Sequence, residues 1–161
     1  MRILTIGGYG FTEQSFVNTL TRSSVDTFVD VRQRRGMRGS KYAFLNSTRL
    51  QHLLDNVGIR YVYSRDLAPT SAVRNTQKAD DIAEGTAKHD RVHLSSEFVE
   101  KYCSDILAHF EPEALWHELK DAKAVALFCV EGPPTACHRS LAAEHLVHAF
   151  GVKEPVEHLS P

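Results

Sequence analysis

The sequence predicts a single α/β domain with a mostly parallel sheet of about four strands and helices on both faces. Short apolar stretches are followed by glycine or charged residues, and stretches with apolar residues at helical spacing lie between them. A length of 161 residues suits one domain with a core of its own. We expect the domain to cover residues 1–151 and the polar residues 152–161 to form a tail that frays.

The N-terminal part of the chain alternates between strand and helix patterns. Thr12 is the expected N-cap of a first helix, because a hydroxyl side chain accepts a hydrogen bond from the first helical turn. A second amphipathic helix is predicted over Ser47–Val57, and Gly58 ends it. Three apolar stretches predict the strands of this part: Arg2–Ile6, Thr27–Val31 and Ile59–Tyr63.

The middle of the chain is harder to assign. Residues 71–94 form a long stretch with many charges. Loops of this length in compact domains are often functional or mobile, so we interpret the stretch as a partly helical lid. Another helix is expected to begin at Ser95–Phe98, with Cys103 packed in the core as a small apolar residue. A further helix is predicted over Glu113–Leu119, with Trp116 in the core.

The stretch from 124 to 148 predicts a strand, a tight loop and a helix. Ala124–Val130 contains no charge and reads as a strand buried on both faces. Pro133 and Pro134 end it, because proline lacks a backbone donor, and helical spacing resumes after Ala136. Ligands of α/β proteins bind at the carboxyl ends of strands. This loop and its edges hold a dense set of reactive side chains: Cys129, Glu131, Cys137, His138 and Arg139.

Bulk properties narrow the class of protein. The net charge is −1, so no global field attracts nucleic acid or membrane, and no apolar run reaches the ~20 residues that span a bilayer. The apolar N-terminal segment is too short for a signal peptide. Three cysteines do not form a disulfide framework and are expected to be reduced. We therefore expect a cytoplasmic protein without membrane association.

A local basic loop stands out against this near-neutral background. The window from Val31 to Leu50 has no acidic residue but six basic ones, with Tyr42 and Phe44 among them. Arginine forks beside aromatic rings suit phosphate contacts and base stacking, so we favour anion binding over a merely solvated loop. The Gly7–Gly10 turn could cradle an anion through its backbone donors, or it could be only a tight turn.

Glu131 is the predicted general acid, base or glycosyl nucleophile, because it follows a buried strand at the expected mouth of the sheet. Asp30 ends a neighbouring strand and is expected to assist it. The alternative is a surface carboxylate that caps the following turn. Arg139 is expected to bind an anion above Glu131, or to form a salt bridge with Glu131 or Asp30.

The cysteines offer two further possibilities. Cys129 lies before a helix N-terminus, which can lower a thiol pKa and produce a nucleophile, although most cysteines in apolar strands belong to the core. Cys129, Cys137 and His138 could also bind zinc, but their spacing fits no standard site and a fourth ligand is missing. The sequence therefore predicts no metal and no cofactor.

Short motifs occur along nearly the whole chain: Thr5-Ile6-Gly7, Val29-Asp30-Val31-Arg32, Gly58-Ile59-Arg60-Tyr61, Leu67-Ala68-Pro69-Thr70, Cys129-Val130-Glu131 and Cys137-His138-Arg139-Ser140. Together they resemble the domain-of-unknown-function 488 (DUF488) family, and the closing Cys, Glu and Cys-His-Arg-Ser pattern is the most specific. Where that family usually has His-Ser after Thr-Ile-Gly, this chain has Gly8-Tyr9. The resemblance implies a small α/β fold and a site position, but no reaction.

The chain is also similar, more weakly, to rhodanese-like and cysteine-phosphatase domains. Asp30-Val31-Arg32, and Phe128-Cys129 followed by a loop and a helix, carry this similarity. Those domains keep a short anion-cradling loop between cysteine and arginine. Here Arg139 lies much farther from the cysteine, and the two prolines supply no backbone donors, which counts against sulfur or phosphoryl transfer.

The leading hypothesis is an enzyme that acts on a nucleotide, nucleoside or nucleic acid, with N-glycosidic cleavage as one candidate reaction. The alternatives are a non-catalytic nucleic-acid or anion-binding module and a rhodanese-like thiol enzyme that uses Cys129. The predicted catalytic residues are Glu131, Asp30, Cys129 and His138. The predicted ligand-binding residues are Gly7, Tyr9, Arg32, Arg35, Arg38, Tyr42 and Arg139, with Tyr9 or Tyr42 stacking the base.

Overall fold

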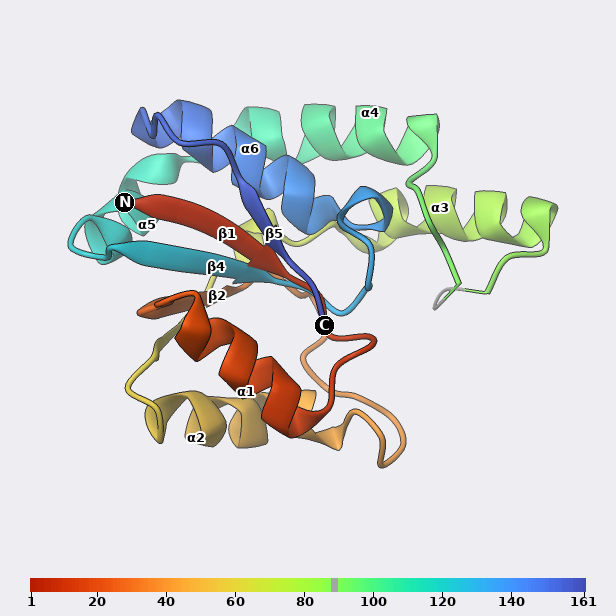
Figure 1. Ribbon diagram of the computed structural model, residues 1–161. Coiled ribbons are helices and arrows are strands. Elements are labelled where there is room, and N and C mark those ends of the chain that lie inside the picture. Colours follow the sequence, from red (N-terminus) through yellow and green to blue (C-terminus); the bar gives the residue numbers. More distant parts are fainter. Residues whose placement is uncertain (88–89) are drawn as a thin grey trace.

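The computed structural model describes residues 1–87 and 90–161 (Figure 1). The strands form one parallel sheet in the order β3-β2-β4-β1-β5. Their bounds are β1 Arg2–Ile6, β2 Thr27–Asp30, β3 Arg60–Tyr63, β4 Ala124–Phe128 and β5 Glu157–Leu159. The predicted α/β class is confirmed, and the four expected strands are present with a fifth beside them.

Helices cover both faces of the sheet. The bounds are α1 Glu13–Arg22, α2 Ser47–Asp55, α3 Ser71–Glu84, α4 Ser96–Asp105, α5 Pro112–Leu119 and α6 His138–Phe150. Figure 1 shows α1 and α2 against one face and α4 and α6 against the other, while α3 extends past the edge where the strands end. Thr12 caps α1 as predicted, because its side chain accepts a hydrogen bond from the Ser15 backbone at 3.1 Å.

Strand β4 is the centre of the fold. All five of its residues are buried, as expected for a strand with sheet neighbours on both sides and helices on both faces. Phe128 is in register with Ile6 of β1 and with Asp30 of β2. The segments that follow these three strands therefore leave the sheet at the same edge, and this brings residues distant in sequence together.

The C-terminal tail was expected to fray, and this expectation is wrong. Glu157–Leu159 adds β5 to the edge of the sheet beside β1. The Thr5 hydroxyl lies 2.7 Å from Nδ1 of His158, and Arg2 forms an ion pair of 3.2 Å with Glu157. A polar strand of three residues has no apolar pattern of its own, because its position depends on pairing with a strand about 150 residues earlier.

Two expected core residues are in fact exposed. Cys103 is exposed, because α4 turns Phe98 and Tyr102 inward instead. Trp116 is 37% exposed and packs against the ring of Phe150, with the ring centroids 5.0 Å apart. In both helices, residues one position away in sequence occupy the buried face.

The predicted lid contains a regular helix. Helix α3 occupies Ser71–Glu84, so the expectation of a partly helical segment is confirmed over that range. The part of the predicted lid at residues 88–89 lies outside the described residues. In the part of the chain that the structure describes, no helix is long and apolar enough to cross a membrane.

Candidate functional site

A cleft of about 720 Å³ lies at the carboxyl edge of the sheet. One side comes from the loop after β2 and the other from α3. The residues between β4 and α6, from Cys129 to His138, form its floor. This is the edge at which α/β proteins bind ligands, and most of the reactive side chains singled out in the sequence line it.

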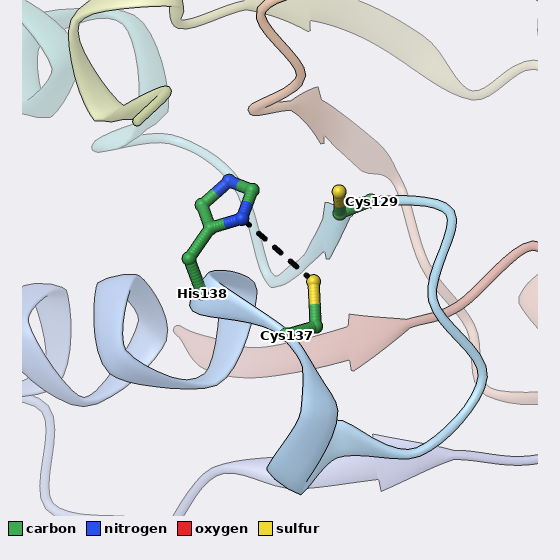
Figure 2. A group of neighbouring side chains, drawn as sticks. All are labelled: Cys129, Cys137 and His138. Atoms are coloured by element: carbon green, nitrogen blue, oxygen red, sulfur yellow. Dashed lines mark hydrogen bonds between the residues drawn. The ribbon is translucent and has the colours of Figure 1, made fainter. Parts of the chain in front are cut away.

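The floor gathers two thiols, a carboxylate and an imidazole. The Cys129 thiol donates a hydrogen bond of 3.0 Å to Oε2 of Glu131, and the Cys137 thiol donates one of 3.3 Å to the same oxygen. Sγ of Cys137 lies 3.8 Å from Nδ1 of His138. All four residues are buried. Figure 2 shows Cys129 just beyond β4, facing Cys137 and His138 at the start of α6.

A backbone carbonyl orients the imidazole of His138. Its Nε2 lies 3.1 Å from the carbonyl oxygen of Val31, which can only accept a hydrogen bond. Nε2 therefore carries a proton, and in the neutral ring the lone pair lies on Nδ1, facing the sulfur of Cys137. Burial acts to lower the pKa of His138, but the neighbouring Cys129 and Glu131 and the Val31 carbonyl raise it above its ordinary value.

Cys129 is held as a protonated thiol. Its hydrogen bond with Cys137, followed by burial, raises its pKa well above the ordinary value. The expected lowering of this pKa by the start of the following helix is therefore outweighed. A neutral thiol is a poor nucleophile, and this counts against a rhodanese-like role for Cys129 acting alone.

Arg139 supports the loop that carries Glu131. The residue is 1% exposed. Its guanidinium donates hydrogen bonds of 2.6 Å and 2.7 Å to the backbone carbonyls of Glu131 and Gly132. These bonds go to the main chain and not to the carboxylates anticipated from the sequence. Arg139 is thus a positioning residue for the floor in this arrangement, and the structure gives it no contact with the cleft itself.

Asp30 and Arg32 form a buried ion pair beneath the cleft. Two nitrogens of Arg32 donate to the two carboxylate oxygens of Asp30 at 2.9 Å and 2.7 Å, and the third donates to the Leu45 carbonyl at 2.9 Å. The Tyr61 hydroxyl donates to Asp30 at 2.7 Å. Burial, and then the charge of Asp30, raise the pKa of Tyr61 to about 12. The hydrogen-bonding groups of Asp30 and Arg32 are thus engaged with each other and with neighbouring residues, while Arg32 also lines the cleft.

The remaining predicted ligand contacts divide between the cleft and its surroundings. Arg38 and Tyr9 line the cleft. Arg35 instead lies over the ring of Tyr63, with its guanidinium carbon 4.0 Å from the centroid. The rings of Tyr9 and Tyr42 are 5.1 Å apart, and the Tyr42 hydroxyl accepts a hydrogen bond from the Gly10 amide.

One wall of the cleft was not predicted from the sequence. Arg74 and Lys78 of α3 line it opposite the loop after β2, and Asp81 follows on the same helix face. Arg91 pairs with Asp81 through two hydrogen bonds. Burial, and then the nearby charge of Arg34, lower the pKa of Arg74. The spacing of four between Arg74 and Lys78 was a usable signal, since such residues share a helix face.

Gly7 allows the loop of Glu131 to approach the turn after β1. A Cβ atom at Gly7 would lie 2.3 Å from the Glu131 carbonyl oxygen and 2.9 Å from that of Gly132. The amides of Gly8 and Tyr9 both donate to the Val130 carbonyl, at 3.0 Å and 2.9 Å. The backbone donors of this turn are therefore used by the loop after β4. The close approach of that loop explains why residue 7 is glycine, and no bound anion is needed to explain it.

Replacing Gly7 by alanine is expected to lower the free energy of unfolding by about 2–3 kcal/mol, because the backbone of Glu131 must move to admit the methyl group. Urea denaturation followed by circular dichroism measures this change. Gly36→Ala is the matched control, since its Cβ would meet only Asn46 Oδ1 at 3.8 Å, and it should change stability by less than about 0.5 kcal/mol. Equal stabilities for the two variants would contradict the close approach.

The fold and the site define an α/β protein with a carboxylate, two thiols and an imidazole at the carboxyl edge of a parallel sheet. The chain belongs to the DUF488 family: the model described as "Domain of unknown function DUF488" matches residues 12–146 of its 161. This confirms the resemblance seen in the sequence motifs. No curated protein and no solved structure showed significant similarity to the chain.

Proposed function

We propose that the protein is an enzyme that binds a nucleotide, nucleoside or nucleic acid in the cleft and acts on it through Glu131. The observation that supports this most is a group of four cations above a buried carboxylate, which we call the basic wall: Arg34 and Arg38 of the loop after β2, and Arg74 and Lys78 of α3 opposite them. Within the described parts of the chain, none of these four cations forms an ion pair with a carboxylate. The cleft thus offers positive charge that its own acids do not neutralise.

The electrostatics of the basic wall favour an anionic ligand. Arg34 and Arg74 are close enough for the charge of one to lower the pKa of the other. Two like charges in proximity destabilise the ligand-free protein, and a phosphate between them would remove that cost. Nε of Arg74 is buried without a hydrogen-bond partner in the described residues, so the guanidinium keeps a donor unused.

The size and walls of the cleft suit a nucleotide. Its volume of about 720 Å³ falls within the range of about 300–1,000 Å³ that is usual for small-ligand sites. Tyr9 lies in its lining and offers a ring on which a base can stack. Met37, Leu94 and Phe98 add apolar surface beside it. Phosphate contacts and base stacking are the two elements of nucleotide recognition, and the cleft offers groups for both.

Glu131 supplies the chemistry in this proposal. Its carboxylate is 7% exposed, faces the cleft and lies within hydrogen-bond distance of two thiols. A buried carboxylate held in a fixed position can transfer a proton to or from a bound substrate. Hydrolysis is the class that fits, and N-glycosidic cleavage is the reaction in which a carboxylate beside the glycosidic carbon acts most directly.

Binding of a fluorescent single-stranded oligonucleotide, titrated with salt beside a competing mononucleotide, tests the ligand class. Replacing Arg34 and Arg74 together by glutamine is expected to weaken binding by about tenfold or more per arginine. If each arginine contacts a phosphate, the slope of log K against log salt should become shallower by about 2.

Arg22→Gln is the matched control for this experiment, because Arg22 is exposed in the last turn of α1, away from the cleft. It should leave affinity and salt slope unchanged. Binding of the mononucleotide alone would identify a nucleotide-sized pocket, and steep salt dependence with the oligonucleotide would identify a nucleic acid. Absence of binding to both would retire the proposal.

A further inference from the structure

We propose that Cys129, Cys137 and His138 form a binding site for a zinc-like divalent metal ion, with an open fourth position that faces Glu131. The two sulfurs and the imidazole nitrogen all lie within 4.8 Å of one another and are buried (Figure 2). The inference deepens the proposed function, because it names the group that would activate water beside Glu131. The ligand set itself rests on geometry alone.

The distance between Cys137 and His138 matches that of two ligands of a tetrahedral ion, and Cys129 Sγ lies within 4.8 Å of both. Zinc binds sulfur at about 2.3 Å and nitrogen at about 2.0–2.1 Å, which places the two ligand atoms about 3.6 Å apart. Sγ of Cys137 and Nδ1 of His138 are 3.8 Å apart. A shift of a few tenths of an ångström would bring these two ligands into position, without any backbone rearrangement.

The orientation of His138 is that of a metal ligand. A ligating histidine usually donates its other ring N–H to a carbonyl or carboxylate, which fixes the ring and its tautomer. Nε2 of His138 donates to the Val31 carbonyl at 3.1 Å, so the Nδ1 lone pair faces the sulfurs. Val31 directly follows β2. The imidazole of His138 is therefore held by the segment that leaves β2 as well as by its own helix, α6.

The chemistry of the ligands favours zinc over harder ions. Two thiolates and an imidazole are soft or borderline donors, whereas magnesium and calcium prefer oxygen. The two thiol protons would leave when the metal binds. The site was hard to recognise from the sequence, since Cys137 and His138 are adjacent and the seven residues between Cys129 and Cys137 match no standard zinc-ligand spacing.

Glu131 lies beside the fourth coordination position. Its Oε2 is 3.0 Å and 3.3 Å from the two sulfurs, shorter than the ~3.5 Å expected between sulfur and oxygen ligands of one zinc ion, so we assign it as a hydrogen-bond acceptor next to the ion and not as a ligand. A water that completes the coordination would therefore lie against the carboxylate. The three ligands and Glu131 all line the cleft, so this position is accessible to a substrate. Three protein ligands with an open position are typical of catalytic zinc.

The proposed step is a hydrolysis in which Glu131 accepts a proton from water and then donates it to the leaving group. A zinc ion held by the two cysteines and His138 would polarise a bound water, and Glu131 would accept a proton from it. The hydroxide forms a bond to the electrophilic carbon of the substrate, and the bond to the leaving group breaks with its electron pair. The leaving group then takes the proton from Glu131. A zinc ion on two cysteines and a histidine beside a non-ligating glutamate activates water in this way in nucleobase deaminases.

Cobalt titration of the full chain tests the site. The wild-type protein is expected to bind one cobalt ion and to show sulfur-to-cobalt charge transfer in the near ultraviolet with intense visible bands of tetrahedral cobalt. Cys129→Ser and Cys137→Ser should each weaken binding at least about a hundredfold and lose that charge transfer. Cys103→Ser is the matched control and should behave as wild type, because Cys103 is exposed and does not belong to the group of three ligand atoms.

Two further measurements do not depend on whether the serine variants fold. In zinc-loaded wild-type protein, a mercurial reagent should react first with the exposed Cys103, without release of zinc, and should release the ion only as Cys129 and Cys137 react. Glu131→Gln should retain cobalt and its charge transfer. Cobalt binding without sulfur charge transfer, or unchanged binding in Cys129→Ser, would overturn the site. Loss of the metal in Glu131→Gln would overturn the open position.

The failure of this inference can be distinguished from failure of the proposed function. Oligonucleotide and mononucleotide binding depends on the basic wall and can be measured on protein treated with a chelator. Ligand binding without metal binding would refute the metal site alone, while metal binding without ligand binding would refute the ligand class alone.

Discussion

Replacing Asp30 by asparagine is expected to lower the free energy of unfolding by about 3–5 kcal/mol, the range typical for removing one partner of a buried ion pair. The side chains of Asp30 and Arg32 are 0% and 2% exposed. Asparagine keeps the shape of aspartate but not its charge, so the guanidinium would remain buried without a counterion. Urea denaturation followed by circular dichroism measures the change.

An exposed ion pair provides the control for this prediction. Glu13 and Arg49 form a surface pair whose side chains are 38% and 57% exposed. Glu13→Gln should cost less than about 1 kcal/mol, since water solvates the remaining charge. A stable Asp30→Asn variant that has lost only turnover would instead support the catalytic role that the sequence suggested for Asp30.

Tyr61 gives a second readout of the same substitution. Burial and then the charge of Asp30 raise its pKa to about 12, against an ordinary value of about 10. Removing that charge should lower the pKa of Tyr61, which alkaline titration of tyrosinate absorbance detects. An unchanged pKa would mean that Asp30 contributes little charge to this network.

The sequence predicted the central fold well, because its information is local there. A short apolar run without charges, such as Ala124–Phe128, indicates a buried strand. Thr12 carries the hydroxyl that caps the first turn of a helix. The edge strand Glu157–Leu159 was missed for the opposite reason. It is short and polar, and only its hydrogen bonds with β1 define it.

The site shows the same division between local and long-range information. Cys129, Glu131, Cys137 and His138 were found together because one loop carries them. Arg74 was not found, since its charge reads as solvated until α3 is placed beside the loop after β2.

The pairing of Asp30 with Arg32 was predictable in principle, because the two residues carry opposite charges and lie only two positions apart at the end of β2.

Replacing Glu131 by glutamine is expected to reduce turnover by about 10²–10⁴-fold while leaving ligand affinity nearly unchanged. The amide oxygen can still accept hydrogen bonds from the two thiols that now contact Oε2, so the floor should keep its shape. An amide cannot accept and return a proton at neutral pH. The measurement incubates the protein with nucleosides, nucleotides and oligonucleotides, separates the products by chromatography, and determines binding in parallel.

Glu144→Gln is the matched control, because Glu144 is exposed on α6, whose first residues belong to the site. It should retain full turnover. Unchanged turnover in Glu131→Gln would remove this carboxylate from the mechanism, and a parallel loss of binding would assign it to the structure of the floor. The product itself identifies the bond that is attacked: release of a free base indicates attack at the glycosidic carbon, while loss of an exocyclic amine indicates attack on the base.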